Sequence, residues 1–136
     1  MGEFVLSVPL RWSDMDAYGH VNHANYLTYL EEARDAALSA ALGIVSGETG
    51  YVVARLEIDY RQELRNTDGP ATVRIAFTTL GTASLRTRET IHSAAGVLAV
   101  ESAAVIVKFD RETRASAPWN AEERAAFTNA GATPRA

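Results

Sequence analysis

The chain has 136 residues, 47% of them hydrophobic and 22% charged, with a formal net charge of −4. This length suits one domain with a substantial core, and the absence of cysteine excludes a disulfide framework, a thiolate nucleophile and a thiolate metal site. The acidic balance argues against a nucleic-acid binder, and no run approaches the ~20 apolar residues of a membrane span.

The first element is predicted to be a strand. Apolar residues occupy alternate positions from Phe4 to Trp12, which is the period of a half-buried strand. This stretch carries an acid at Glu3 and lacks the basic start and unbroken apolar run of a signal peptide. We therefore expect a cytoplasmic protein.

A long helix is predicted after a polar loop that runs from Asp14 to His23. Residues at three- and four-residue steps trace one narrow face, and Gly43 is a good stop signal. These positions are Tyr26, Leu30, Ala33, Ala37 and Ala41. Because so many side chains on this helix are small, we expect it to lie close against a sheet and to be mostly buried.

Four more strands are predicted from alternation and turn signals, at residues 52–61, 71–77, 83–92 and 97–109. The last is apolar on both faces for most of its length and should lie inside the sheet. Asn120, with Glu123 three residues later, predicts a short final helix that ends near Phe127. We thus expect one domain over residues 1–127 and a flexible tail over residues 128–136.

The segment from Arg11 to Arg34 carries the chemistry. Its sequence, RWSDMDAYGHVNHANYLTYLEEAR, places a carboxylate pair and a glycine-bearing turn directly before the helix. If Asn22 caps the helix, the backbone N–H groups of His23, Ala24 and Asn25 lack intrahelical partners. Asp16 would then lie beside donors able to stabilise an oxyanion, which favours attack on a carbonyl.

This segment resembles the signature of the 4-hydroxybenzoyl-CoA thioesterase-like family of hotdog-fold acyl-CoA thioesterases. The similarity lies in DMDAYGHVNHANYLTYLEEAR, in a helix that precedes four strands, and in VKFDRETRASAP at the end of the last strand. It covers about residues 4–120. The resemblance implies an α+β hotdog fold, in which a five-stranded antiparallel sheet wraps a central helix, with a short C-terminal helix.

The resemblance also implies hydrolysis of an acyl-CoA thioester to a free acid and coenzyme A, without a metal or other cofactor. The family's catalytic aspartate falls on Asp16, as nucleophile or as general base, and the His23 N–H falls on the oxyanion donor. Taken alone, Asp16 is better interpreted as an Asx-turn residue, and the resemblance reverses that preference. Asn22 is expected as the cap or, less readily, as a substrate contact.

Several further residues have two interpretations. The His23 ring could position a water or pack at a protomer contact, and Glu31 could be an alternative base or a surface charge facing Arg34. His20 is expected at the solvent or an interface, and it forms no metal site with His23 for want of a third ligand. The proposed substrate-binding residues are Tyr18 and Gly19 in the turn, Tyr26 at the acyl group, and Arg88 and Arg114 at the coenzyme A phosphates.

The resemblance further implies two kinds of partner: an acyl-CoA or acyl-carrier-protein thioester, and other copies of the chain in a homodimer or homotetramer with sites at the protomer interface. Two other functions stay open: a noncatalytic acyl-CoA-binding protein, and a hydratase or dehydratase whose His and Asp act on the acyl carbon chain. The dehydratase motif has no clear match here. Ala17 stands where many family members have proline, and the acyl group is undecided.

Overall fold

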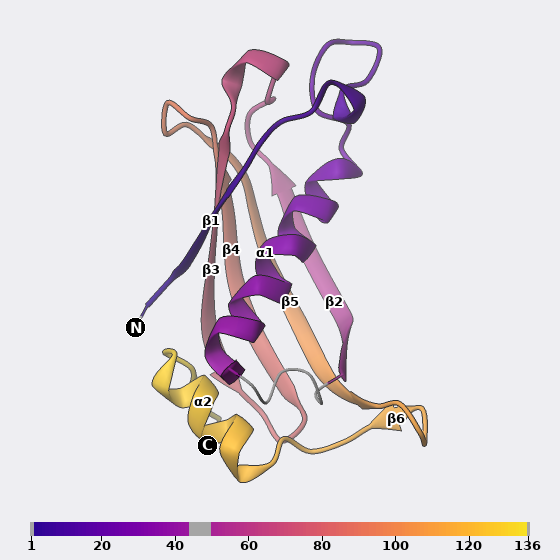
Figure 1. Cartoon of the computed structure of the whole chain (residues 1–136), viewed down its shortest axis with the longest axis vertical. Helices are drawn as coiled ribbons and strands as arrows, with labels where there is room; N and C mark the ends of the chain where they lie inside the picture. Colours follow the sequence, from indigo (N-terminus) through magenta and orange to yellow (C-terminus); the bar gives the residue numbers. More distant parts are fainter. Residues whose placement is uncertain (1, 44–49, 136) are drawn as a thin grey trace.

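The computed structural model describes residues 2–43 and 50–135 and forms a curled sheet around one helix (Figure 1). Helix α1 spans Asn25–Leu42, and five strands form the continuous path β1-β3-β4-β5-β2 with antiparallel pairing throughout. Their bounds are Phe4–Val8 for β1, Gly50–Tyr60 for β2, Ala71–Leu80 for β3, Ser84–His92 for β4 and Leu98–Asp110 for β5. The expected hotdog fold is confirmed.

Short elements extend this path at both ends of the sheet. The two-residue strand β6 (Ala115–Ser116) pairs with β5, and β7 (Thr133–Pro134) runs parallel to β3. In the described chain, 3-10 turns lie at Trp12–Asp14 and Asn66–Asp68, and helix α2 spans Ala121–Asn129. The final helix therefore runs two residues beyond its expected end.

The core lies between α1 and the concave face of the sheet. Tyr29, Leu30 and Ala33 of α1 are at most 1% exposed, and they pack with buried residues of β3, β4 and β5 such as Ile75, Leu85 and Ile106. The predicted buried stripe of α1 is thus present, and β5 is an interior strand as expected. Gly43 ends the helix with a φ of 63°, and its N–H donates to the Ser39 carbonyl.

Three local expectations were wrong. The first strand ends at Val8, and Trp12 stands in a 3-10 turn with its side chain 83% exposed. A register shift between Val53 and Arg55 interrupts the alternation of β2. The described part of the segment expected as a flexible tail, residues 128–135, is packed, because Ala132 is 4% exposed and the Arg135 N–H donates to the Leu80 carbonyl.

Candidate active site

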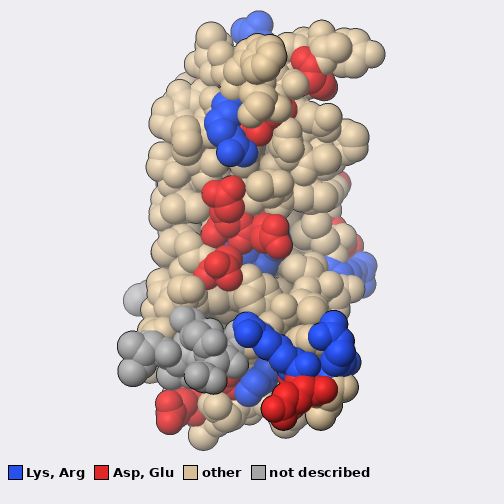
Figure 2. Space-filling model, turned by 45° about the vertical axis from the view of Figure 1, so that its right-hand side comes forward, with Lys and Arg blue, Asp and Glu red and all other residues tan. Residues whose placement is uncertain are grey.

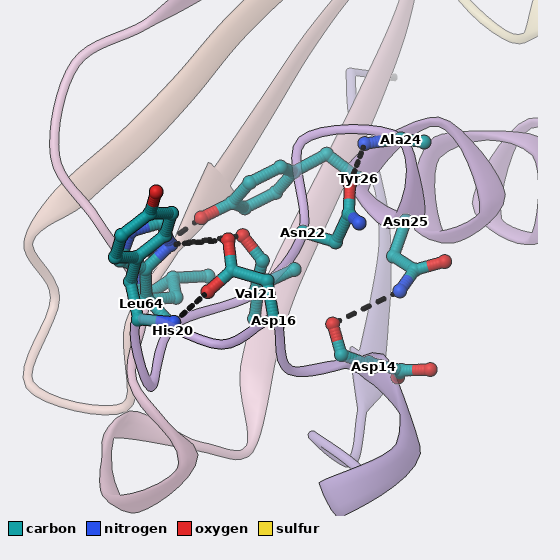
Figure 3. A network of polar contacts seen from close by, with 10 residues as sticks. Asp14, Asp16, His20, Val21, Asn22, Ala24, Asn25, Tyr26 and Leu64 are labelled. Carbon is teal, nitrogen blue, oxygen red and sulfur yellow. Dashed lines mark hydrogen bonds and ion pairs between the residues drawn. The ribbon is translucent and has the colours of Figure 1, made fainter.

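A small loop holds the predicted catalytic acid at the start of α1 (Figure 3). The Asp16 N–H donates to the His20 carbonyl, the Gly19 N–H donates to the Asp16 carbonyl, and Met15 and Val21 form a bridge. Gly19 adopts a φ of +82°, a conformation that side chains rarely allow. The turn therefore needs glycine at this position, and it brings Asp16 back toward the helix.

A buried polar network fixes this loop to α1. The Asp14 carbonyl accepts hydrogen bonds from the Asn25 side chain and from the Asn22 N–H, both at 2.9 Å. Its carboxylate accepts from Tyr29 Oη at 2.7 Å and from the exposed Arg11 guanidinium at 3.2 Å. Asp14 is 4% exposed, and these contacts anchor the loop to α1.

The Asp16 carboxylate has two different neighbours. Its Oδ1 accepts the Tyr18 N–H at 2.9 Å, which forms the Asx turn of the alternative interpretation, while Oδ2 lies 3.4 Å from Nδ1 of His20. Nδ1 also lies 3.3 Å from the Val21 carbonyl oxygen, so both of its neighbours are hydrogen-bond acceptors. The turn uses only one carboxylate oxygen, and the other is directed at an imidazole that we expected at the solvent or an interface.

Asp16 lines a cavity of about 300 Å³, called the Asp16 cavity below. The loop and α1 contribute Asp16, His20, Val21, His23 and Tyr26 to it, and β2 with the residues that follow contributes Tyr60, Arg61, Gln62 and Glu63. The cavity combines two carboxylates, two imidazoles and two phenols on a partly apolar floor. Arg61 is already paired with Glu101 at 2.9 Å and Asp59 at 3.5 Å.

The start of α1 offers fewer free donors than expected. The helix begins at Asn25 with Ala24 as its cap residue, so Asn22 caps the preceding turn instead. The Ala24 N–H donates to Asn22 Oδ1 at 3.0 Å and the Asn25 N–H to the Asn22 carbonyl at 2.8 Å. Of the three predicted donors, only the His23 N–H has no acceptor among the described residues.

The other predicted residues divide between this cavity and distant surfaces. Tyr26 lines the cavity and its Oη accepts the Leu64 N–H, whereas Tyr18 is 85% exposed and stacks on His20. Glu31 is an exposed residue of α1 that does not line the cavity. The side chain of Arg34 does not face Glu31. Arg34 is instead buried against Glu89, with two hydrogen bonds of 2.8 Å.

Within one chain, the two predicted phosphate-binding arginines lie away from the Asp16 cavity. Arg88 is exposed on the sheet face opposite α1, in a hollow that it shares with Glu57, Asp59 and Glu101. Arg114 belongs to the β5–β6 turn, with its guanidinium carbon 5.2 Å from the centre of the Phe109 ring. Figure 1 shows this turn at the opposite end of the molecule from the Asp16 loop.

Sequence reasoning missed the contribution of β2. Tyr60 and Glu63 lie about forty residues after the Asp16 loop, and their wall of the cavity forms only when the sheet curls around α1. Figure 2 shows that acidic side chains gather at mid-height on the face in view, with basic side chains both above and below them. The charges are thus mixed and give no continuous basic surface on this face.

Two further kinds of feature are absent from residues 2–43 and 50–135. No helix there is long and apolar enough to cross a membrane. No group of three or more histidine or acidic side chains in these ranges is placed to hold a metal ion.

Comparison with known proteins places the chain among thioesterases. Residues 10–127 match the thioesterase-like superfamily. A putative thioesterase from Pseudomonas aeruginosa, PA2801, is 31% identical, with 93% of this chain and 99% of that chain covered and a TM-score of 0.79. A search of curated proteins gives no match.

Two further solved structures share the fold. A thioesterase from Thermus thermophilus, solved with coenzyme A and zinc, is 28% identical over 92% of this chain and 91% of that chain, with a TM-score of 0.81. A 1,4-dihydroxy-2-naphthoyl-CoA thioesterase from Synechocystis is 19% identical over 94% and 97%, with a TM-score of 0.80. With the family match over most of its length, the chain belongs to the thioesterase-like superfamily and is a thioester hydrolase of the hotdog fold.

Proposed function

We propose that the protein hydrolyses acyl-CoA thioesters, with Asp16 as the reacting carboxylate and the His23 N–H as the oxyanion donor. One observation carries the proposal: Asp16 and His23 line the same cavity, and the N–H of His23 has no acceptor in the described chain. The similar Thermus thermophilus thioesterase was solved with coenzyme A, which supports this thiol as the leaving group. The hydrolysis needs no oxidant or reductant, and the expectation of no cofactor stays a prediction.

Asp16 can act in two ways. Its carboxylate oxygen can attack the thioester carbon, which breaks the C–S bond, releases the thiolate and leaves an anhydride that water then hydrolyses. Alternatively, it takes a proton from a water that attacks the same carbon. In both routes, negative charge develops on the carbonyl oxygen, where an oriented N–H donor is worth about 2.7–4 kcal/mol. His20, with Nδ1 facing Asp16, orients the carboxylate in both.

The test is thiol release from a panel of aliphatic and aromatic acyl-CoA thioesters, with wild type compared to Asp16→Asn. Asparagine keeps an Oδ1 acceptor for the Tyr18 N–H, so the turn should survive. We expect the rate constant kcat to fall at least about a hundredfold. Glu31→Gln is the matched variant, and it should keep wild-type turnover because Glu31 lies outside the cavity. Loss of activity in Glu31→Gln with an active Asp16→Asn would transfer the role to Glu31.

The Asp16–His20 contact also gives the hydratase or dehydratase alternative a specific basis, since that chemistry needs His and Asp together. An α,β-unsaturated acyl-CoA separates the two functions. Hydratase activity adds water across the double bond and leaves the thioester intact, whereas thioesterase activity releases free thiol. Saturable binding without either reaction would instead support the noncatalytic acyl-CoA-binding function. Matched coenzyme A and acyl-carrier-protein thioesters would identify the preferred thiol.

We also propose that the working unit is a homodimer or homotetramer. Strand β2 ends the strand order and pairs only with β5 among the described residues, so its other edge is open. Val52 and Val53 on this strand are 44% and 43% exposed, and Tyr60 at its end lines the Asp16 cavity. A copy paired along β2 would therefore stand next to the cavity. Light scattering tests this, and a monomer at assay concentration would contradict it. The cytoplasmic location stays a prediction.

A further inference from the structure

The orientation of the His23 N–H depends on the peptide groups on both sides of it. In the Asn22–His23 peptide, the carbonyl accepts the Asn25 N–H at 2.8 Å. Because a trans peptide points its carbonyl and its N–H in opposite directions, the His23 N–H points away from the first turn of α1. This leaves it free to meet a ligand in the Asp16 cavity.

The following peptide, between His23 and Ala24, is held at both of its polar atoms. The Ala24 N–H donates to Asn22 Oδ1 at 3.0 Å, and the His23 carbonyl accepts the Tyr60 hydroxyl at 3.0 Å. The first contact is local to the turn. The second comes from β2, 37 residues along the chain, so it ties the turn to the sheet.

Tyr60 is itself positioned by aromatic contacts. Its ring packs edge-on against Tyr26, with centroids 5.4 Å apart, and against the His23 ring at 6.5 Å. Burial raises the pKa of the Tyr60 hydroxyl above its ordinary value of 10.0, so it keeps its proton and donates at neutral pH. Tyr60 is 47% exposed and lines the Asp16 cavity.

We infer that Tyr60 is a positioning residue for the oxyanion donor: its hydroxyl holds the His23 carbonyl, and this hold keeps the His23 N–H directed into the Asp16 cavity. The inference rests on the proposed function. Without the hydroxyl, the His23–Ala24 peptide is held only at its N–H, so the backbone at His23 moves more freely and the donor spends less time aimed at the developing oxyanion. The transition state loses stabilisation while substrate binding changes little.

Strand β2 supplies a matched control for the test. Tyr51, at the other end of this strand, donates its hydroxyl to Asp35 of α1 at 3.0 Å and does not line the Asp16 cavity. Tyr60→Phe and Tyr51→Phe each remove one hydroxyl and one hydrogen bond to the helix side of the fold, and both keep the ring. Equal melting temperatures would show that any difference in catalysis is not a difference in folding.

We expect Tyr60→Phe to lower kcat about tenfold, less than the 10²–10³ of a deleted oxyanion donor, with KM within about twofold of wild type. Tyr51→Phe should keep wild-type kcat and KM. Asn22→Ala, which frees the other end of the same peptide, should also lower kcat with little change in KM. The inference would be overturned if Tyr60→Phe kept the wild-type kcat or raised KM alone. The proposed function would still stand in that case, provided that thiol release depends on Asp16.

A spectroscopic measurement detects the hydrogen bond from the His23 N–H to the substrate carbonyl directly. In the slow Asp16→Asn background, the infrared carbonyl band of a bound thioester labelled with carbon-13 should lie below its frequency in solution, because a hydrogen bond polarises the carbonyl. Addition of Tyr60→Phe should move the band back toward the solution value, and addition of Tyr51→Phe should not. An unmoved band in the Tyr60 variant would refute the inference. Failure of wild type to release thiol from any substrate would overturn the inference together with the proposed function.

Discussion

The hydroxyl of Tyr29 donates a 2.7 Å hydrogen bond to the carboxylate of Asp14, and the two residues are 1% and 4% exposed. This pair joins α1 to the loop that carries Asp16. Asp14 lies two residues before the proposed catalytic acid in the sequence, and the geometry of the pair therefore sets where that acid stands. The interaction can be tested separately from catalysis through its effect on stability.

The first prediction concerns acid stability. Burial raises the pKa of the Asp14 carboxyl, but the hydrogen bonds from Tyr29 and Arg11 outweigh burial and bring it below its ordinary value of 3.8. Because its pKa is lower in the folded protein than in the unfolded chain, the Asp14 carboxylate stabilises the fold at pH values above the unfolded-state pKa. This contribution is lost as the pH falls through the folded-state pKa. Tyr29→Phe should lower the free energy of unfolding at neutral pH by about 1.5–3 kcal/mol and move acid unfolding to higher pH.

Urea unfolding at a series of pH values measures both effects. Tyr51→Phe is the control, because its hydroxyl bonds to an exposed carboxylate and its loss should cost less without any shift in acid unfolding. An acid transition that stays at the wild-type pH in Tyr29→Phe would contradict the role given to this hydrogen bond.

The second prediction concerns the buried ion pair of Arg34 and Glu89. Glu89 is 0% exposed and accepts hydrogen bonds from Arg34, from Thr87 Oγ1 at 2.7 Å and from Ser102 Oγ at 2.8 Å. Glu89→Gln leaves the Arg34 charge uncompensated and should destabilise the fold by about 3–5 kcal/mol. The double variant Arg34→Met with Glu89→Leu should cost less than this single one, as measured by chemical denaturation. A larger loss in the double variant would argue against an uncompensated charge as the cause.

The third prediction concerns the turn at Gly19. A Cβ there would meet no atom within 4 Å, so any penalty comes from the φ of +82° and not from a clash. Gly19→Ala should destabilise the protein by about 1 kcal/mol and lower kcat, because the turn places Asp16. Gly96→Ala is the matched comparison, since Gly96 has a φ of +88° with equally open space but lies outside the Asp16 cavity. It should show a similar loss of stability with unchanged kcat.

The fourth prediction concerns the C-terminal segment. Removal of residues 130–136 exposes the surface covered by Ala132 and deletes the bond from the Arg135 N–H to the Leu80 carbonyl, 2.8 Å long. Each lost hydrogen bond is worth about 0.5–1.5 kcal/mol, so the melting temperature should fall by several degrees. Removal of Ala136 alone is the control. An unchanged melting temperature after the longer deletion would restore the expectation of a flexible tail.

Local pattern was enough to predict the strands and the helix, because alternation and helical spacing are properties of consecutive residues. It failed where tertiary context decides the outcome. The bulge near Val53 and Arg55 depends on pairing with β5, and Arg34 turns inward to Glu89, 55 residues away, instead of toward Glu31.

The candidate site shows the same division. The resemblance carried by residues 14–34 located Asp16 and His23, which the structure places in one cavity. Tyr60 gave no local signal, because a tyrosine at a strand end is ordinary until the fold brings it to the His23 carbonyl. Asn22, Ala24 and Asn25 were assigned from a helix boundary that lies two residues later in the structure.

The packing of α1 against the sheet determines the position of the helix along its own axis. Ala33 and Ala37 are at most 2% exposed, and their small side chains let this part of α1 lie close to the sheet. The two hydrogen bonds of 2.8 Å between Arg34 and Glu89 have a specific planar geometry, so they fix the position of α1 along the sheet. Asn25, the first residue of α1, precedes Arg34 by 9 residues, about 14 Å along the helix, so a buried ion pair fixes the position of the helix end beside His23.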